Sequence, residues 1–365
     1  MYSNWVTVDT SAIRNNIQFI LEHTQTQVMA IVKANAYGHG TIPVAQAAIE
    51  AGATWCGVAR FSEALELRRA NINCPILLLG YTPREHFEDM IDNQVSMTVW
   101  DPEQISWLST AAERAGQPAR IHIKVDTGMS RLGVQPEDVG DLVLLVTNNS
   151  NIHFEGIYSH FARADEANPA AADLQWDRFQ SVLADLDSQN IRPPIVHHAN
   201  SAASLTREET SLSLVRFGIA MYGLHPSAEC LLPDDFRPAL SWKSILSQVK
   251  TLPPGRGVSY GHEYVTERNE RIGTIPLGYA DGFRRLRGNQ VLVGGKRVPV
   301  IGRVTMDQIL VQLDEVPESQ AGDEVVLIGK QGDELITAED LAAIWGTINY
   351  EVTCAIGPRV PRLYK

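Results

Sequence analysis

The segment VMAIVK (Val28–Lys33) is the first of eight short, apolar, β-branched runs that decide the fold of this chain. The other seven are Trp55–Ala59, Pro75–Gly80, Val95–Val99, Arg120–Val125, Phe154–Ser159, Pro194–His198 and Leu214–Phe217. Between them lie stretches with helical spacing, namely Ser11–Glu22 behind a Thr10 or Ser11 cap, Ser62–Ala70, Asp101–Ala115 and Leu174–Gln189. Strands that alternate with helices are usually parallel, and eight of them close a (β/α)8 barrel. The pattern therefore predicts an α/β protein with a TIM-like barrel; an open, doubly wound sheet is the alternative.

The pattern changes after about Cys230. Short strand-like segments bounded by proline and by glycine turns follow, such as Ser241–Leu252 and Gln308–Leu313, and only Thr337–Trp345 has helical spacing. We expect a barrel over residues 9–230, a linker within His225–Pro238, and a mostly β domain over residues 231–365.

Composition limits the classes of function. The 365 residues are 44% hydrophobic and 20% charged, which is typical of a globular protein with a full core. A net charge of −12 without a basic block argues against nucleic-acid and membrane partners. The four cysteines form no zinc spacing and no metal site is predicted, while their scattered use and the lack of a leader-like or membrane-spanning stretch predict a cytoplasmic protein.

Polar side chains stand at the carboxyl ends of the predicted barrel strands, where barrel enzymes carry their active sites. The positions are Lys33, Lys124, His160, His197 and Arg216. A barrel interior otherwise takes branched apolar residues, so each of these cations and imidazoles needs a reason to be there.

Lys33 ends a buried run, where loss of hydration lowers the pKa of an amine and makes it nucleophilic. It could form a Schiff base with a cofactor, or its ammonium could simply extend to the solvent at the barrel rim, and spacing favours neither. Small residues and a serine follow the last two strands, at Asn200-Ser201 and Gly218-Ile219, where barrels bind phosphate. A phosphate beside a nucleophilic lysine points to pyridoxal phosphate.

Nine motifs in order give the chain a resemblance to the alanine racemase family, which has a barrel followed by a mostly β domain. They are AIVKANAYGHG (30–40), KVDTGMSRLG (124–133), SHFARADE (159–166), HHANSAASL (197–205), VRFGIAMYGL (215–224), GVSYG (257–261), GTIPLGYADG (273–282), GRVTMDQ (302–308) and TINYEV (347–352). The resemblance spans nearly the whole chain. It implies a pyridoxal-phosphate-dependent isomerase that interconverts L- and D-alanine and supplies D-alanine for cell-wall precursors. In this family an N-terminal strand, here within residues 1–8, joins the second domain.

The resemblance also implies catalytic roles. Lys33 would hold the cofactor and act as one base, and Tyr260 would be the second base on the opposite face of the planar adduct with substrate. Two bases suit racemisation because the α-proton leaves one face and another arrives on the opposite face. Because a free phenol has a pKa near ~10, Tyr260 would be assisted by His160, which is linked to Arg216. Arg216 would face the pyridine nitrogen and, as a donor only, leave it unprotonated.

Further residues would bind cofactor and substrate by the same resemblance. Those for the phosphate are Tyr37, Ser201, Tyr350 and the backbone of Gly218 and Ile219, while Asn200 and His197 would pack around the ring. Arg131 would bind the phenolic oxygen and the substrate carboxylate, with Met306 adding a backbone contact. Tyr279, with Tyr350, would line the entrance, and Lys124 would be a carbamate that steadies Arg131.

The family site is shared between two subunits, so the resemblance implies a homodimer in which the second domain completes the partner's site. Alternatives within the fold are a racemase of broader or serine specificity and, with less support, a decarboxylase of amino acids. A tyrosine at position 350 favours alanine, and Arg216 stands where a decarboxylase of this fold has an acid. A cofactor-carrying barrel without catalysis is a third alternative, but it would lack the region after Cys230.

Overall fold

The computed structural model describes residues 2–365, which form two compact units. The barrel unit comprises Ala12–Ala36 and Thr41–Arg237. The sheet unit comprises the residues up to Ser11, the short segment Tyr37–Gly40 and Pro238–Lys365. Residues 231–237 therefore group with the barrel. No helix among the described residues is long and apolar enough to cross a bilayer.

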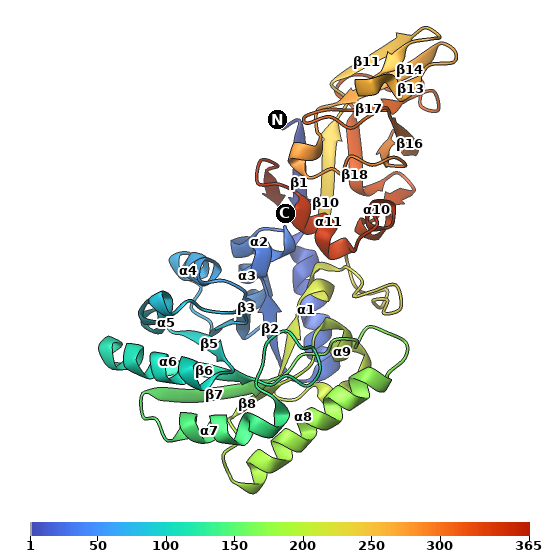
Figure 1. Ribbon diagram of the computed structural model, residues 1–365. Coiled ribbons are helices and arrows are strands. Elements are labelled where there is room, and N and C mark those ends of the chain that lie inside the picture. Colours follow the sequence, from blue (N-terminus) through green and yellow to red (C-terminus); the bar gives the residue numbers. More distant parts are fainter. Residues whose placement is uncertain (1) are drawn as a thin grey trace. The chain divides into compact units, whose positions relative to one another are not determined.

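The barrel unit contains eight parallel strands in the order β8-β7-β6-β5-β4-β3-β2-β9 (Figure 1). The two ends of this sheet meet, because the backbone N–H of Ser213 donates to Val196 O at 3.1 Å and that of Arg216 donates to Ala199 O at 3.1 Å. The strands are β2 (Gln27–Ile31), β3 (Trp55–Val58), β4 (Ile76–Leu78), β5 (Val95–Val99), β6 (Ala119–Lys124), β7 (Ile152–Tyr158), β8 (Ile195–His197) and β9 (Leu214–Phe217). The predicted barrel is confirmed, and the open sheet is wrong.

All eight predicted runs contain a strand, with ends that differ by at most two residues. One difference concerns the site, because β2 ends at Ile31 and Lys33 therefore lies in the turn that follows it. The strands are buried on both faces, as parallel barrel strands must be, and all five residues of β5 are inaccessible.

Helices surround these strands. Those of the barrel unit are α1 (Thr10–Thr24, which begins in the sheet unit), α3 (Thr41–Glu50), α4 (Phe61–Arg69), α5 (Phe87–Asp92), α6 (Pro102–Ala115), α7 (Val139–Thr147), α8 (Ala170–Ser188) and α9 (Ser201–Thr206). Single 3-10 turns lie at η1 (Arg84–His86), η2 (Pro136–Asp138), η3 (Glu208–Thr210) and η4 (Ile219–Tyr222). The predicted start of α6 is confirmed, since the Asp101 carboxylate accepts from Glu103 N at 2.8 Å ahead of a proline in the first turn.

The cap of α1 was predicted one residue too late. Asp9 begins this helix, because its Oδ1 accepts both Ser11 N at 2.9 Å and Ser11 Oγ at 2.6 Å. A carboxylate is as good an N-cap as a hydroxyl, so Thr10 and Ser11 become the first residues of the helix.

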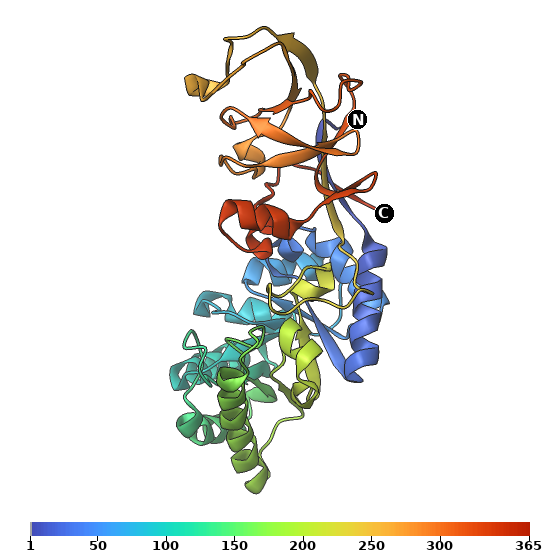
Figure 2. The ribbon, with the colours of Figure 1, turned by 90° about the vertical axis from the view of Figure 1, so that its right-hand side faces the viewer.

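The sheet unit is built on ten strands, of which nine follow the order β11-β14-β17-β16-β15-β18-β10-β1-β20, while β19 pairs with β18. Figure 2 shows the N-terminal strand β1 (Asn4–Val8, blue) among the strands of this sheet. The others are β10 (Leu240–Ile245), β11 (Gln248–Leu252), β14 (Glu270–Ile275), β15 (Gln290–Val293), β16 (Lys296–Ile301), β17 (Ile309–Gln312), β18 (Glu324–Gln331), β19 (Glu334–Ile336) and β20 (Arg362–Tyr364), with β12 (Gly257–Val258) and β13 (Tyr264–Val265) as a separate pair. β1 is antiparallel to β10 and parallel to β20.

The predicted strand Ser241–Leu252 is in fact two strands. β10 ends before Leu246, and β11 pairs with β14 instead of continuing β10. The helical content was underestimated as well. α10 (Ala338–Trp345) was predicted, but α11 (Asn349–Ala355) follows it, and η5 (Tyr260–His262) and η6 (Tyr279–Asp281) are single turns.

The turn after β2 has an unusual backbone. Within the element α2 (Lys33–Tyr37), four successive residues from Ala34 to Tyr37 have φ between +50° and +53°. Residues other than glycine rarely adopt this left-handed conformation, so neighbouring groups must hold the turn. Its last part, Tyr37–Gly40, packs in the sheet unit, where a Cβ on Gly38 would lie 2.1 Å from Thr353 O.

Candidate active site

The centre of the candidate site in the barrel unit is the guanidinium of Arg216 on β9, which is 3% exposed. Its Nη2 donates to Ser159 O at 2.7 Å, His198 O at 2.8 Å and His160 Nδ1 at 3.0 Å. Its Nη1 donates to His197 Nδ1 at 2.8 Å and His197 O at 3.2 Å. No carboxylate bonds to it, and burial lowers its pKa to about 10. The Nε–H forms no hydrogen bond with any described residue, so one donor of a rigid, charged group is uncommitted.

The bonds of Arg216 fix the protonation of two histidines. Because a guanidinium only donates, His160 Nδ1 and His197 Nδ1 must both be acceptors, and each neutral ring carries its proton on Nε2. Burial and then the charge of Arg216 hold the pKa of both imidazoles well below the usual value. His160 therefore presents an Nε2–H donor at neutral pH.

Positive charge is concentrated around Lys124 at the end of β6. This side chain is 4% exposed and forms no hydrogen bond or ion pair with the described residues. Burial, followed by Arg216 and Arg131, lowers the pKa of its amine to about 8, with a smaller contribution from Lys33. Arg131 is exposed and forms no ion pair within residues 2–365. Positive charges therefore outnumber negative ones around Lys124, and its amine loses a proton more readily than an ordinary lysine does.

Ser201 joins the loops after β8 and β9. Its Oγ accepts Gly218 N at 2.9 Å and Ala220 N at 3.4 Å, while its own hydroxyl hydrogen has no acceptor among the described residues. Asn200 caps α9 by accepting Ala203 N at 3.0 Å. The loops predicted to bind an anion are thus tied together around one hydroxyl donor that remains available.

The Lys33 turn is held by Glu63, in the first turn of α4. The Glu63 carboxylate accepts Ala34 N at 2.7 Å, Ala59 N at 2.8 Å and Arg60 N at 3.1 Å. On the other side of the turn, Asn35 Oδ1 accepts Thr41 N at 3.1 Å. These bonds compensate the left-handed backbone and fix the residue that follows Lys33.

Within the sheet unit, the two predicted phosphate tyrosines lie together. The rings of Tyr37 and Tyr350 are 6.0 Å apart between centroids, and Tyr350 belongs to α11. Burial, with Tyr350 and Cys354 nearby, raises the pKa of the Tyr37 phenol, which therefore stays a donor at neutral pH.

Three other predicted residues lie at the surface of the sheet unit. Tyr260 begins η5, is 71% exposed, and its hydroxyl forms no hydrogen bond with the described residues. Met306 and Tyr279 are also exposed, and they are neighbours because Met306 O accepts Ala280 N at 3.1 Å and Thr305 O accepts Tyr279 N at 3.0 Å.

The sequence prediction missed three buried residues that are linked to this centre directly or through His197. Tyr158 stacks on His197 with centroids 4.6 Å apart, and the Arg216 guanidinium lies 5.1 Å from its ring. His122 Nδ1 is hydrogen-bonded to His197 Nε2 at 2.9 Å, and His122 Nε2 lies 3.3 Å from Glu155 Oε2. His122 could have been found, because it stands two residues before Lys124 and alternation places both side chains on the inner face.

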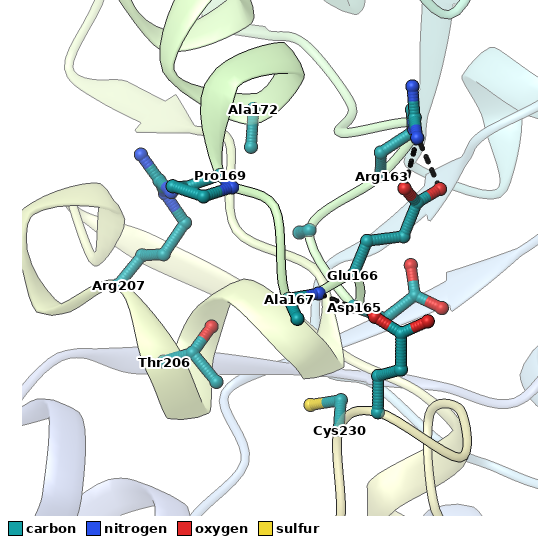
Figure 3. Close-up of a pocket in the computed structure, with 11 residues that line it drawn as sticks. Arg163, Asp165, Glu166, Ala167, Pro169, Ala172, Thr206, Arg207 and Cys230 are labelled. Carbon is teal, nitrogen blue, oxygen red and sulfur yellow. Dashed lines mark hydrogen bonds and ion pairs between the residues drawn. The ribbon is translucent and has the colours of Figure 1, made fainter.

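A cavity of about 250 Å³ in the barrel unit is lined by none of the predicted site residues (Figure 3). Arg163 Nε donates to Glu166 Oε1 at 2.7 Å, Arg207 is bonded to Asp173, and Glu229 accepts Ala167 N at 2.7 Å. Arg163, Arg207 and Glu229 therefore already have partners, and we assign the cavity no role.

His198, next to His197, is buried between aromatic rings, with Phe161 stacked at 3.9 Å and Phe179 at 4.9 Å between centroids. Neither ring nitrogen has a hydrogen-bond partner within residues 2–365. We expect His198→Phe to stabilise the fold by about 1–2 kcal/mol, because it removes two unsatisfied polar atoms and retains the ring. Thermal unfolding measures the change.

The gain from His198→Phe should grow in acid. Burial, then Arg216 and Arg207, hold the pKa of His198 well below its usual value, so below about pH 6.5 the unfolded chain takes up a proton that the folded chain refuses. His153→Phe, at an exposed position of β7, is the control. A melting temperature for His198→Phe below that of the natural protein would contradict this prediction and show that the His198 imidazole stabilises the fold.

Both units of the chain match the same protein family. Residues 8–226 match the family model "Alanine racemase, N-terminal domain", and residues 239–364 match "Alanine racemase, C-terminal domain". An alanine racemase of Desulfovibrio desulfuricans is 45% identical over 364 residues, which cover 99% of this chain and 97% of that protein. One of Geobacillus kaustophilus is 46% identical over 99% of this chain and 94% of its own.

Solved structures of the same family are similar to this chain over its whole length. The crystal structure of alanine racemase from Streptomyces lavendulae has a TM-score of 0.95 at 41% identity and covers 100% of this chain and 97% of its own. That from Bacillus anthracis, with bound L-Ala-P, has a TM-score of 0.94 at 42% identity, with 100% and 96% covered.

Proposed function

The chain belongs to the alanine racemase family and is an isomerase that interconverts L- and D-alanine, and we propose that it does so with two bases, Lys33 and Tyr260, and with pyridoxal phosphate. The observation that carries the proposal is Arg216, a buried donor bonded to two neutral histidines and to no carboxylate. Loss of optical rotation in a solution of L-alanine with the purified enzyme tests the activity.

The donors of the barrel unit fit pyridoxal phosphate. Its phosphate needs hydrogen-bond donors, which the Ser201 hydroxyl offers, and its ring nitrogen is an acceptor that the uncommitted Arg216 Nε–H suits. Tyr37, Tyr350 and the backbone of Gly218 and Ile219 would complete the phosphate site. Lys33 would hold the group covalently, Asn200 would lie beside its ring, and Arg131 would bind its phenolic oxygen.

His197 acts through Arg216 in this proposal. It is fully buried and bonded to the guanidinium, so its contribution to the ring site is to orient that guanidinium. When bound, pyridoxal phosphate withdraws electrons from the α-carbon of alanine and so makes the α-proton removable.

The two bases serve opposite faces of the α-carbon. Lys33 takes the α-proton of D-alanine and Tyr260 takes that of L-alanine, and each gives a proton back when the reaction runs the other way. His160 is suited to assist Tyr260, because its Nε2–H can donate a hydrogen bond to the phenolic oxygen.

The substrate carboxylate would be bound by Arg131 and by the backbone N–H of Met306. A guanidinium fork suits a carboxylate, and Arg131 forms no ion pair among the described residues. Tyr279, next to Met306 in the sheet unit, would line the approach to the site.

Lys124 would carry a carbamate. Its neutral amine attacks carbon dioxide, forming an N–C bond and releasing a proton, and the new anion would offset the charges of Arg131 and Arg216. With a pKa of about 8, the amine is increasingly available above that pH. We expect ¹³C-labelled bicarbonate to give one carbamate NMR signal, absent in Lys124→Arg; an unchanged spectrum in that variant would remove this assignment.

The working unit would be a homodimer in which Tyr260 and Met306 act in the partner's barrel, and the sheet unit, which contains both residues and the N-terminal strand, would provide them. Support comes from the exposure of the Tyr260 and Met306 side chains, 71% and 53%, in the sheet unit. Without a partner subunit, the proposed base Tyr260 and the proposed carboxylate-binding residue Met306 would face solvent.

Arg216→Glu tests the role given to the guanidinium. A carboxylate at this position would favour a protonated ring nitrogen, a stronger electron sink, and protonation away from the α-carbon. We expect racemisation to fall by about 10²-fold or more, while formation of pyruvate from alanine rises. The control is Arg216→Lys, which keeps the positive charge. If pyruvate formation does not rise in Arg216→Glu, Arg216 does not suppress the side reaction.

A further inference from the structure

Glu155 is directed into the barrel by an irregularity in strand pairing. Ile121 of β6 lies opposite Phe154 of β7, but the next residue, His122, lies opposite Gly156, so Glu155 is an extra residue without a partner in the register. Such a bulge changes the direction in which a side chain points. The carboxylate is buried, with the residue 7% exposed, and therefore needs specific partners.

The neighbouring glycine makes room for the first of these partners. A Cβ at Gly156 would lie 2.5 Å from both Cε1 and Nδ1 of His122, so only glycine allows this imidazole its position. His122 is completely buried, with its Nε2 at 3.3 Å from Glu155 Oε2 and its Nδ1 at 2.9 Å from His197 Nε2. A series of close polar contacts thus runs from Arg216 to Glu155, in which His197 and His122 are hydrogen-bonded and the contact of His122 with Glu155 is electrostatic, because His122 Nε2 forms no hydrogen bond with the described residues.

The protons on this path can be arranged in only one way. Arg216 donates to His197 Nδ1, so His197 carries its proton on Nε2 and donates it to His122 Nδ1. His122 then carries its proton on Nε2, which faces the Glu155 carboxylate. A cation stands at one end, an anion at the other, and two neutral rings lie between them.

We propose that Glu155 is the counter-charge of Arg216, and that Glu155 and His122 are positioning residues that fix the tautomer of His197 and the orientation of the guanidinium. The proposal rests on the proposed function for its effect on the reaction, but the path itself is a property of the barrel. It explains how a buried arginine without a directly bonded carboxylate is balanced.

Other contacts of Glu155 support its ionised state. Burial opposes ionisation, but the adjacent His122 imidazole, the hydrogen bond from Ser96 and the nearby Arg120 guanidinium hold the pKa of this carboxyl below its usual value. Arg120 Nη1 lies 3.5 Å from Glu155 Oε1, and its side chain is 46% exposed. A simple surface ion pair with Arg120 is therefore the competing explanation for Glu155.

The test uses ¹⁵N NMR of the purified holoenzyme, which reports imidazole tautomers and the Arg216 Nε signal whether or not the protein racemises alanine. In the natural protein, we expect His122 and His197 as Nε2–H tautomers only. Glu155→Gln keeps an acceptor for His122 but removes the charge, so it should shift the signals of His197 and Arg216 Nε. It should also lower kcat by about three- to ten-fold with little change in KM.

Two controls make the test specific. Arg120→Gln breaks the surface pair and should leave the His197 and Arg216 signals unchanged. His122→Phe interrupts the path, so adding Glu155→Gln to it should change neither signal nor kcat further. Should Glu155→Gln fail to fold, His122→Phe alone must still shift the Arg216 Nε signal.

Three results would overturn the proposal: an Nδ1–H tautomer at His197, equal effects of Arg120→Gln and Glu155→Gln, or additive effects of the His122 and Glu155 substitutions. A wild-type protein that shows the predicted tautomers but no racemisation would instead count against the proposed function.

Discussion

Lys33→Ala is expected to abolish racemisation in both directions, with a loss of at least about 10³-fold in kcat/KM. The substitution removes one base and, in the same atom, the group proposed to hold pyridoxal phosphate. Position 33 should tolerate the smaller side chain, because Glu63 holds the turn through the backbone N–H of Ala34. The fold should survive while the chemistry is lost.

Borohydride reduction followed by peptide mapping provides a second measurement on the same residue. The natural protein should be labelled at Lys33 alone, and Lys33→Ala should take up no label. Methylamine should restore part of the activity of Lys33→Ala, because it supplies an amine of the missing kind. Lys250→Ala, at an exposed position of β11, is the control. Labelling at another lysine in the natural protein would refute the assignment.

Tyr260→Phe should separate the two directions of the reaction. It removes only a hydroxyl that is bonded to none of the described residues, so its effect on stability should be small. We expect kcat/KM for racemisation to fall by about 10²- to 10⁴-fold. In deuterated water, D-alanine should still exchange its α-proton through Lys33, whereas L-alanine should not.

Tyr81→Phe, on the barrel and 57% exposed, is the matched control and should behave as the natural protein does. Equal loss of exchange from both enantiomers of alanine in Tyr260→Phe would mean that Tyr260 is not the base for one face.

Mixing the two inactive variants tests the shared site. If Lys33 of one subunit works with Tyr260 of its partner, a heterodimer of Lys33→Ala and Tyr260→Phe has one intact site and one that lacks both bases. Random reassociation should therefore restore roughly a quarter of the natural activity. No recovery after verified subunit exchange would place both bases in the same chain.

The barrel could be predicted because its strands are buried on both faces and read as unbroken β-branched runs, such as VSMTV at β5. The short helix α11 could not, because Thr347-Ile348-Asn349-Tyr350 carries β-branched and aromatic residues that favour strands, and tertiary contacts override that preference. Asp9 was missed as a cap because three adjacent residues can all cap a helix.

The candidate site divides in the same way. Residues at strand ends, such as Arg216 and His160, were found because parallel strands bring their carboxyl ends together. Glu155 was not, since its direction depends on a bulge, and a bulge arises from the pairing of two strands rather than from either strand alone. The left-handed turn after β2 could not be predicted either, because its residues are not glycine, the residue type that commonly signals a positive φ.

The position of β1 between β10 and β20 has a consequence for biosynthesis. β1 precedes the barrel in the chain, but its neighbours β10 and β20 are made only after the barrel, the first of them roughly 230 residues later. Until then β1 has two unsatisfied edges and must wait, exposed to chaperones or to strands of other nascent chains. The sheet can therefore close around β1 only after β10 and β20 have been made, and a fragment beginning at Pro238 would lack an interior strand of its own sheet.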